Sequence, residues 1–237
     1  MGINFIIVVR NKAMAVLFIP LFWILFIIVT IFTFLFRILQ LNTLRRILRK
    51  GRKISVLFLE VVPKDNAGYL YRSQKWQNIL KQNGINSRVY TVVTQEKNFN
   101  KLQNATYLIP IFFLVFICKR FIQCCVAFNY DVVIVRRELL IFNDYGNLFM
   151  EIFLRCINNK IILDFDDDIS DAKHEPRKIS LYGKILIEVP DKFIQTLNFY
   201  NYFTPGSNYL KERILLHNPL CNEDNISVPA VSFRLAP

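Results

Sequence analysis

The order of apolar and polar residues divides the chain into an uncharged N-terminal stretch and a longer part in which strand-like and helix-like segments alternate. Ala13 to Phe36 is 24 residues without a charge. From Lys53 onward, short runs of β-favouring apolar residues alternate with longer mixed stretches. That alternation predicts an α/β domain whose strands lie parallel in one sheet.

The expected elements follow from these runs and from the Pro, Gly and Asn residues that bound them. We expect strands at 54–62, 87–93, 131–135, from 161, at 200–204 and at 226–228. We expect helices at about 69–82, 101–128, 145–157, 179–199 and 207–216. The predicted fold is a Rossmann-like, doubly wound parallel sheet with helices on both faces, preceded by one N-terminal transmembrane helix.

The uncharged stretch is long enough to cross a bilayer, since about 20 apolar residues span the hydrocarbon core. A signal peptide is less suitable, because its apolar region would be shorter and followed by a small-residue cleavage site. Two basic residues precede the stretch and seven follow it by Lys53, which predicts an external N-terminus and a cytoplasmic domain. The expected boundaries are a tail at 1–12, a transmembrane helix at 13–36 and a basic juxtamembrane helix at 37–52.

Net charge points to the same setting. The chain carries +12, and residues 1–53 hold nine of the 30 Lys and Arg and no acid. A basic excess beside an apolar span predicts attraction to anionic lipid of the inner leaflet, and nucleic acid is not expected as a partner. In the juxtamembrane helix, we expect one apolar face flanked by cations to lie at the level of the lipid headgroups. These residues are Leu41, Leu44, Ile47 and Leu48, with Arg45, Arg46, Arg49 and Lys50 beside them.

One further stretch leaves two alternatives open. Residues 106–118 are almost unbroken apolar sequence, too short to span a bilayer, and suit either a core helix or a lipid-facing patch.

The five cysteines contain no CxxC pair, so neither a disulfide framework nor a zinc site is indicated, and a reducing compartment is expected.

The candidate chemistry begins where the strand from Ile161 runs into Asp164, Asp166, Asp167 and Asp168. Unpaired carboxylates are costly to bury, so they belong at the carboxyl end of the strand, the edge at which open α/β sheets bind ligands. Three uses remain open: an Asp-x-Asp metal site, proton acceptance from a substrate hydroxyl, or ion pairs with Arg136 or Arg137.

Two other strand ends carry polar residues. The turn after the first strand contains Gly68, which permits close backbone approach, and Arg72, which can reach a phosphate or a carboxylate. The alternative is a plain loop in which Asp65 or Asn66 caps the following helix. The third strand ends in Arg136, Arg137 and Glu138, for which an ion pair or a ligand contact is expected.

Several of these segments, in this order, resemble the N-terminal domain of family 4 type glycosyltransferases of the glycosyltransferase-B fold. The resemblance covers residues 53–229. The segments are KISVLFLEVVP, GYLYRSQKWQNILKQNG, YDVVIVRRE, KIILDFDDDI, FTPGSNYLKERI and NISVPAV.

The resemblance implies metal-independent transfer of a sugar, hexosyl in type, from a nucleotide-sugar to a lipid-linked or surface-glycan acceptor at the cytosolic membrane face, as in polysaccharide biosynthesis. It implies no cofactor besides the donor substrate, and an acceptor-binding role for this domain. Many relatives have a histidine where this chain has Asp166 or Asp167. The expected catalytic residues are Asp166 and Asp167, and the expected substrate-binding residues are Gly68, Tyr69, Arg72, Asp164, Arg137 and Glu138.

The resemblance also implies a second, donor-binding domain, with its linker starting at 230–237. Either the chain is a truncated gene product or a separate subunit supplies that domain, and transfer is not expected without it. Two alternatives stand beside this reading. One is a non-catalytic membrane-anchored scaffold, and the other is a manganese-dependent glycosyltransferase of the glycosyltransferase-A type that uses Asp-x-Asp.

Overall fold

The fold is described from a computed structural model. It describes residues 2–93, 109–140, 144, 147–166 and 192–229, with side chains from residue 20 in the first helix and from residue 114 in α5. Asp167, Asp168 and the elements predicted within residues 94–108 and 167–191 therefore lie outside the described residues, as does the linker predicted at 230–237.

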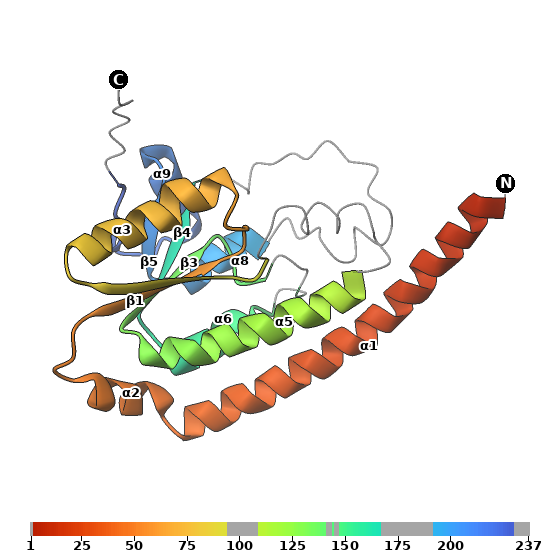
Figure 1. The fold of residues 1–237 in the computed structure, drawn as a ribbon, viewed down its shortest axis with the longest axis horizontal. Coiled ribbons are helices and arrows are strands. Elements are labelled where there is room, and N and C mark those ends of the chain that lie inside the picture. Colours follow the sequence, from red (N-terminus) through yellow and green to blue (C-terminus); the bar gives the residue numbers. More distant parts are fainter. Residues whose placement is uncertain (1, 94–108, 141–143, 145–146, 167–191, 230–237) are drawn as a thin grey trace.

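Five parallel strands form one sheet in the order β2-β1-β3-β4-β5 (Figure 1). The strands are β1 (Ser55–Glu60), β2 (Asn86–Thr91), β3 (Val132–Arg136), β4 (Ile161–Phe165) and β5 (Tyr202–Pro205). The predicted α/β fold with a parallel sheet is confirmed. The strand expected at 226–228 is reduced to one parallel bridge between Ile226 and Phe203.

The chain order within the sheet creates one switch point. After β1 the chain adds β2 on one side and then returns to place β3 on the other side of β1. In open α/β sheets, ligands bind outside the carboxyl ends of the strands at such a reversal. The ends of β1 and β3 are therefore the first place to look for a site.

Helices cover the sheet on both faces, with α3 on one side and α5 and α6 on the other (Figure 1). A π-helical turn, η1 (Tyr69–Gln74), leads into α3 (Lys75–Gln82). The others are α5 (Ile109–Val126), η3 (Ala127–Asn129), α6 (Phe149–Ile157), α8 (Lys192–Phe199), α9 (Asn208–His217) and η4 (Glu223–Asn225). The core between these layers contains fully buried Leu57, Val133 and Leu163 from the strands and Phe153 from α6.

The capping residues expected from the sequence lie where they were predicted. Gly84 follows α3 with φ +73°, the left-handed conformation that glycine adopts without strain. Ser207 caps α9, its hydroxyl accepting the backbone N–H of Leu210. In the turn before η1, Asn66 Oδ1 accepts the backbone N–H of Gly68 at 2.9 Å.

The N-terminal helix, α1, runs over Gly2–Ile38, and its segment Pro20–Ile38 is long and apolar enough to cross a membrane. This segment packs lengthwise against α6. The ring centroids of Phe22 and Phe149 lie 5.8 Å apart, and those of Phe36 and Phe153 lie 5.6 Å apart. Figure 1 shows α1 running beneath α5 and α6. One face of α1 is thus part of the domain's core.

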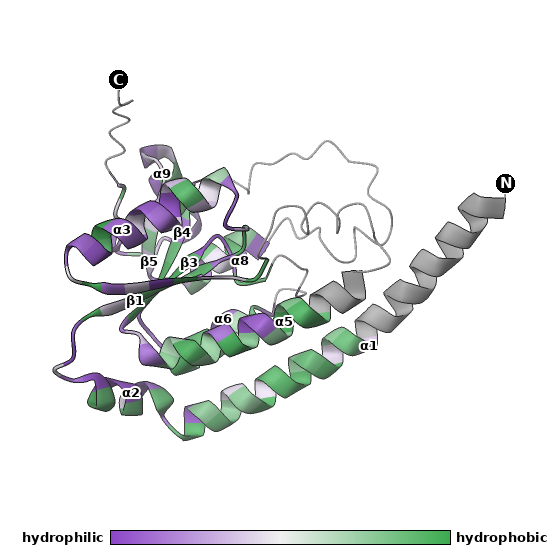
Figure 2. Ribbon diagram, viewed as in Figure 1, coloured by the Kyte–Doolittle hydropathy of each residue, from purple (hydrophilic) through white to green (hydrophobic). Residues whose placement is uncertain are grey.

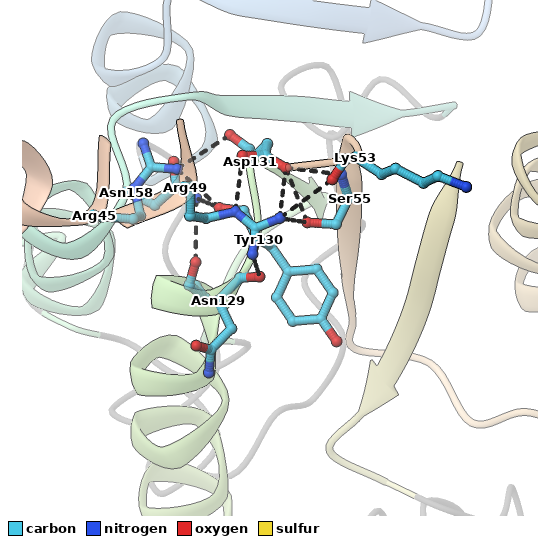
Figure 3. A network of polar contacts seen from close by, with 9 residues as sticks. Arg45, Arg49, Lys53, Ser55, Asn129, Tyr130, Asp131 and Asn158 are labelled. Atoms are coloured by element: carbon cyan, nitrogen blue, oxygen red, sulfur yellow. Dashed lines mark hydrogen bonds and ion pairs between the residues drawn. The ribbon is translucent and has the colours of Figure 1, made fainter. Parts of the chain in front are cut away.

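The short helix α2 (Leu41–Arg49) is held against the amino end of the sheet by two arginines (Figure 3). Arg45, which is 2% exposed, donates to the carbonyl of Tyr130 at 2.8 Å. Arg49 binds both carboxylate oxygens of Asp131, at 2.9 and 2.8 Å. The prediction that Arg45 and Arg49 flank a lipid-facing surface is therefore wrong for these two, since their side chains turn into the domain.

Candidate functional site

Six polar side chains meet at the carboxyl edge of the sheet, and we call them the carboxyl-edge cluster. Glu60 ends β1, Arg136 ends β3, Asp164 lies in β4 and Asp166 follows it, while Arg72 and Ser73 come from η1. Burial is strong for Glu60 (0% exposed), Arg136 (5%) and Asp164 (6%). Charged groups are rarely so buried unless they are paired, so the contacts within the cluster determine what it can do.

Arg72 and Asp164 form a bidentate ion pair. Arg72 Nη2 lies 2.5 Å from Asp164 Oδ1, and Nε lies 3.2 Å from Oδ2. The same Nη2 donates to the carbonyl of Thr204 at 3.1 Å, and the Thr204 hydroxyl donates to Asp164 at 2.8 Å. The pair thus joins the turn after β1 to both β4 and β5.

Arg136 links the other two carboxylates to the glycine turn. Its Nη2 lies 2.7 Å from Asp166 Oδ2, its Nη1 donates to the Gly68 carbonyl at 2.6 Å, and Nη1 lies 3.8 Å from Glu60 Oε1. The sequence left open whether an aspartate pairs with Arg136 or Arg137. The structure gives the pair as Asp166 with Arg136.

Glu60 has the most perturbed carboxylate in the cluster. Burial raises the pKa of Glu60 to about 7, against the opposing effects of the Arg136 charge and a hydrogen bond from Ser73. Its second oxygen, Oε2, has no hydrogen-bond partner among the described residues. A buried carboxyl group with a pKa near neutrality is typical of functional sites, although structural ion pairs perturb pKa values too.

Two glycines let the backbone approach the arginines. A Cβ on Gly68 would lie 3.1 Å from Arg136 Nη2. A Cβ on Gly206, which follows β5, would lie 3.0 Å from Arg72 Nη1 and 3.1 Å from the Asp166 Cα. The expected role of Gly68 in close backbone approach therefore has a specific neighbour, the guanidinium of Arg136.

Arg137 and Glu138, the two residues after β3, lie in different surroundings. Arg137 has φ +63°, an uncommon conformation for a residue other than glycine, and its guanidinium donates no hydrogen bond to any described residue. Glu138 lies instead near Lys192 of α8, with Oε2 3.9 Å from Nζ. Burial raises the pKa of Glu138, with Lys192 opposing the shift. The structure therefore does not bring Glu138 into contact with the carboxyl-edge cluster.

Tyr69 and Asp166 are the remaining predicted site residues in the described part. Tyr69 is buried beside Glu60, and burial together with the Glu60 charge raises the pKa of its hydroxyl. Asp166 is more open, with 31% of its side chain exposed, although its Oδ1 is buried and has no hydrogen-bond partner among the described residues. Asp166 is thus the most open carboxylate of the cluster.

A metal site is not apparent in the described part of the chain, where no group of three His, Cys, Asp or Glu side chains is arranged to hold a metal ion. The two described aspartates of the Asp-x-Asp sequence, Asp164 and Asp166, each bind a guanidinium. All five cysteines are free thiols.

Sequence reasoning missed several members and neighbours of the cluster. They are Glu60, Ser73, Thr204 and Gly206, while Arg136 was expected only as an ion-pair partner. One signal was present: a glutamate inside an otherwise apolar strand is rarely buried without a partner, so Glu60 already required a cation nearby. Its partner, Arg136, could not be chosen by spacing, because it lies in another strand.

Comparison with known proteins identifies no family for this chain. No family model, no curated protein and no solved structure matches the chain.

Proposed function

We propose that the chain is the acceptor-binding lobe of a membrane-bound glycosyltransferase of the family 4 type, with a doubly wound Rossmann-like sheet. The lobe binds a lipid-linked or surface-glycan acceptor at the cytosolic face of the cytoplasmic membrane. A second, donor-binding lobe supplies the nucleotide-sugar, and no metal or cofactor takes part. Asp166 carries this proposal, because it is a partly exposed carboxylate at the carboxyl edge of the sheet, the edge at which open α/β sheets bind ligands.

The chemistry follows from the charges around Asp166. A hydroxyl of the acceptor donates to the Asp166 carboxylate, which Arg136 holds through Oδ2. As the hydroxyl oxygen bonds to the anomeric carbon of the donor sugar, the bond from that carbon to the nucleotide diphosphate breaks, and the hydroxyl proton passes to a carboxylate. Asp167, the next residue, shares this role in the proposal.

A phosphate in the acceptor has a candidate partner in Arg137. Its guanidinium follows β3 at the same edge, and its unusual backbone conformation is of the kind that is often found at ligand sites. Arg72 and Asp164 contribute to substrate binding by position, because their ion pair fixes the turn that contains Gly68 and Tyr69.

Attachment to the membrane is the second part of the proposal. It is supported by the apolar segment Pro20–Ile38 and by the basic residues that follow it. The basic excess after this segment favours a cytoplasmic domain. Two arrangements attach the domain to the cytosolic face. The sequence predicts a helix that crosses the membrane once, with an external N-terminus. A helix that lies in the membrane plane is the other arrangement.

The test is a transfer assay. Membranes containing the chain are given labelled nucleotide-sugars and a lipid acceptor, with and without a candidate donor-binding lobe. We expect labelled lipid only when both lobes are present, and we expect Asp166→Asn to lower its formation at least a hundredfold. The matched control is Asp224→Asn, at an exposed aspartate in η4, which should leave transfer unchanged. Equal transfer by the two variants would refute the role of Asp166.

A non-catalytic scaffold is the second candidate, and one observation favours it. Asp164 and Asp166 both pair with arginines that connect distant strands, contacts that would stabilise the domain without any substrate. A scaffold predicts that no nucleotide-sugar is used with any donor-binding lobe. It also predicts that Asp166→Asn lowers the melting temperature without any other effect.

A further inference from the structure

The face of α1 that points away from the domain is apolar and exposed. Trp23, Ile24, Ile27, Ile31, Phe34 and Ile38 are between 45% and 64% exposed. Figure 2 shows this helix as hydrophobic along nearly all of its described side chains. An apolar surface of this extent on a protein marks a site of interaction with a partner or a membrane.

The opposite face of the same helix is not free for lipid. Phe22 and Val29, one heptad apart, are 0% and 2% exposed, and the Phe26 ring lies 5.6 Å from that of Phe149 in α6. To cross a bilayer on its own, this segment would have to separate from α6 and expose Phe149. It would otherwise draw α6 into the hydrocarbon together with Glu151, which is costly for a carboxyl group.

Helix α2 extends the apolar surface beyond the end of α1. Its arginines Arg45 and Arg49 bind the domain, so Leu44, Ile47 and Leu48 face outward, at 43%, 67% and 50% exposure. Because Arg49 donates to Asp131, the domain and not lipid holds its side chain in place. The domain itself thus fixes the direction in which the apolar side of α2 points.

Beside this apolar side lies a basic hollow of about 730 Å³ between α2 and the start of β4. Its lining includes Arg46, Lys50 and Lys160, whose side chains make no hydrogen bond or ion pair to any described residue, and Ile47. Cations that are free, exposed and adjacent to outward apolar residues match the chemistry of a phospholipid, with its phosphate above its acyl chains.

We propose that α1 and α2 form one docking face that lies in the plane of an anionic bilayer, with the basic hollow binding a phospholipid phosphate. In this arrangement Pro20–Ile38 rests along the membrane surface and keeps its contacts with α6, and does not cross the bilayer. The inference rests on the membrane attachment proposed above and not on sugar transfer.

Vesicle flotation tests the headgroup contact. The full chain is synthesised in the presence of phosphatidylcholine vesicles, or of vesicles that also contain phosphatidylglycerol. We expect tighter binding to the anionic vesicles, weakened about a hundredfold by the triple variant Arg46→Gln, Lys50→Gln and Lys160→Gln. The matched control neutralises Lys64, Lys75 and Lys81, which are exposed around α3. Equal losses in the two variants would overturn the assignment of the hollow, since general charge would then explain binding.

Tryptophan depth tests whether α1 lies in the plane. The chain has two tryptophans, so Trp76→Phe leaves Trp23 as the only reporter, and Trp23→Phe with Ile31→Trp or Ile38→Trp moves it along the exposed face. Quenching by brominated lipids should report one shallow depth, about 5–10 Å below the phosphates, at all three positions. A reporter at position 31 near the bilayer centre, with positions 23 and 38 near opposite surfaces, would show that the helix crosses. Neither experiment involves a nucleotide-sugar, so its outcome is independent of the transfer assay.

Discussion

Arg72 and Asp164, 92 residues apart in the chain, form a bidentate ion pair with their closest atoms 2.5 Å apart. The pair ties the turn after β1 to β4 and, through Thr204, to β5. It is mostly buried, with 13% and 9% of the two side chains exposed. Its removal therefore has consequences that a surface ion pair would not have.

Breaking the pair from one side should be strongly destabilising. Arg72→Met leaves the Asp164 carboxylate buried without its cation, which costs about 3 kcal/mol. Adding Asp164→Asn removes the stranded charge and should recover part of the loss. Thermal unfolding in detergent measures both, and Lys81→Met on the exposed side of α3 is the control. If Arg72→Met and the double variant melt at the same temperature, the charge on Asp164 is not what the arginine offsets.

The two glycines of the site should respond differently to an added methyl group. Gly206→Ala places its Cβ against the backbone of Asp166, which can move only together with β4. Gly68→Ala meets side-chain atoms of Arg136 and Asn66, which can rotate away. We expect Gly206→Ala to cost about 2 kcal/mol and Gly68→Ala clearly less. Melting temperatures of the two variants decide the order, and the reverse order would contradict this packing.

The stability of the domain should depend on pH through Glu60. Its pKa is about 7 in the folded chain and about 4.5 when unfolded, so the folded state holds the proton more tightly. The contribution of Glu60 to stability is therefore fully present below about pH 4.5 and is lost as the pH rises through about 7. The total loss is about 3 kcal/mol, at 1.36 kcal/mol per pKa unit.

Glu60→Gln tests this dependence, because the amide does not ionise. The difference in melting temperature between the variant and the natural chain should shift in favour of the variant from about pH 4.5 to about pH 7. Asp224→Asn, at an exposed position, should show no such shift. A constant difference across this range would mean that folding does not raise the pKa of Glu60.

The attachment of α2 should depend on Arg49 and not on its neighbour Arg46. Burial acts to raise the pKa of Asp131, but hydrogen bonds from Arg49 and Ser55 outweigh it and lower the pKa. Arg49→Met removes these charge-assisted bonds, so amide exchange in α2 should accelerate at least tenfold. Arg46 is exposed, and Arg46→Met should leave the exchange rates of α2 unchanged.

The strands and most helices could be predicted because their signals are local. The apolar run at 54–62 contains β1, the run at 131–135 covers β3 except its last residue, Arg136, and Gly84 and Ser207 bound their helices as expected. The acidic strand was also placed correctly, since charge cannot continue into the core. Local pattern sufficed wherever one segment determines its own conformation.

Two things could not be predicted from local sequence: which side chains from different strands pair, and which side of a helix packs against the domain. Glu60, Arg136 and Asp166 come from three strand ends, and their contacts depend on strand order and not on spacing along the chain. Likewise, an uncharged helix has the same sequence pattern whether lipid or α6 covers it. For α2, the spacing of Arg45 and Arg49 by one turn put both on one face, but Asp131 and the carbonyl of Tyr130 decided that this face is the inner one.

The most direct test of the central claim, that the carboxyl edge of the sheet binds the acceptor, is the position at which an acceptor crosslinks. The full chain in anionic vesicles is irradiated with a prenyl-diphosphate sugar that carries a photoreactive group on the sugar, and the modified peptides are identified by mass spectrometry. We expect labelling of the turn around Gly68 and of the residues after β3 around Arg137, suppressed by excess unlabelled acceptor. Labelling confined to α1 and α2, or labelling that excess acceptor does not reduce, would contradict the account.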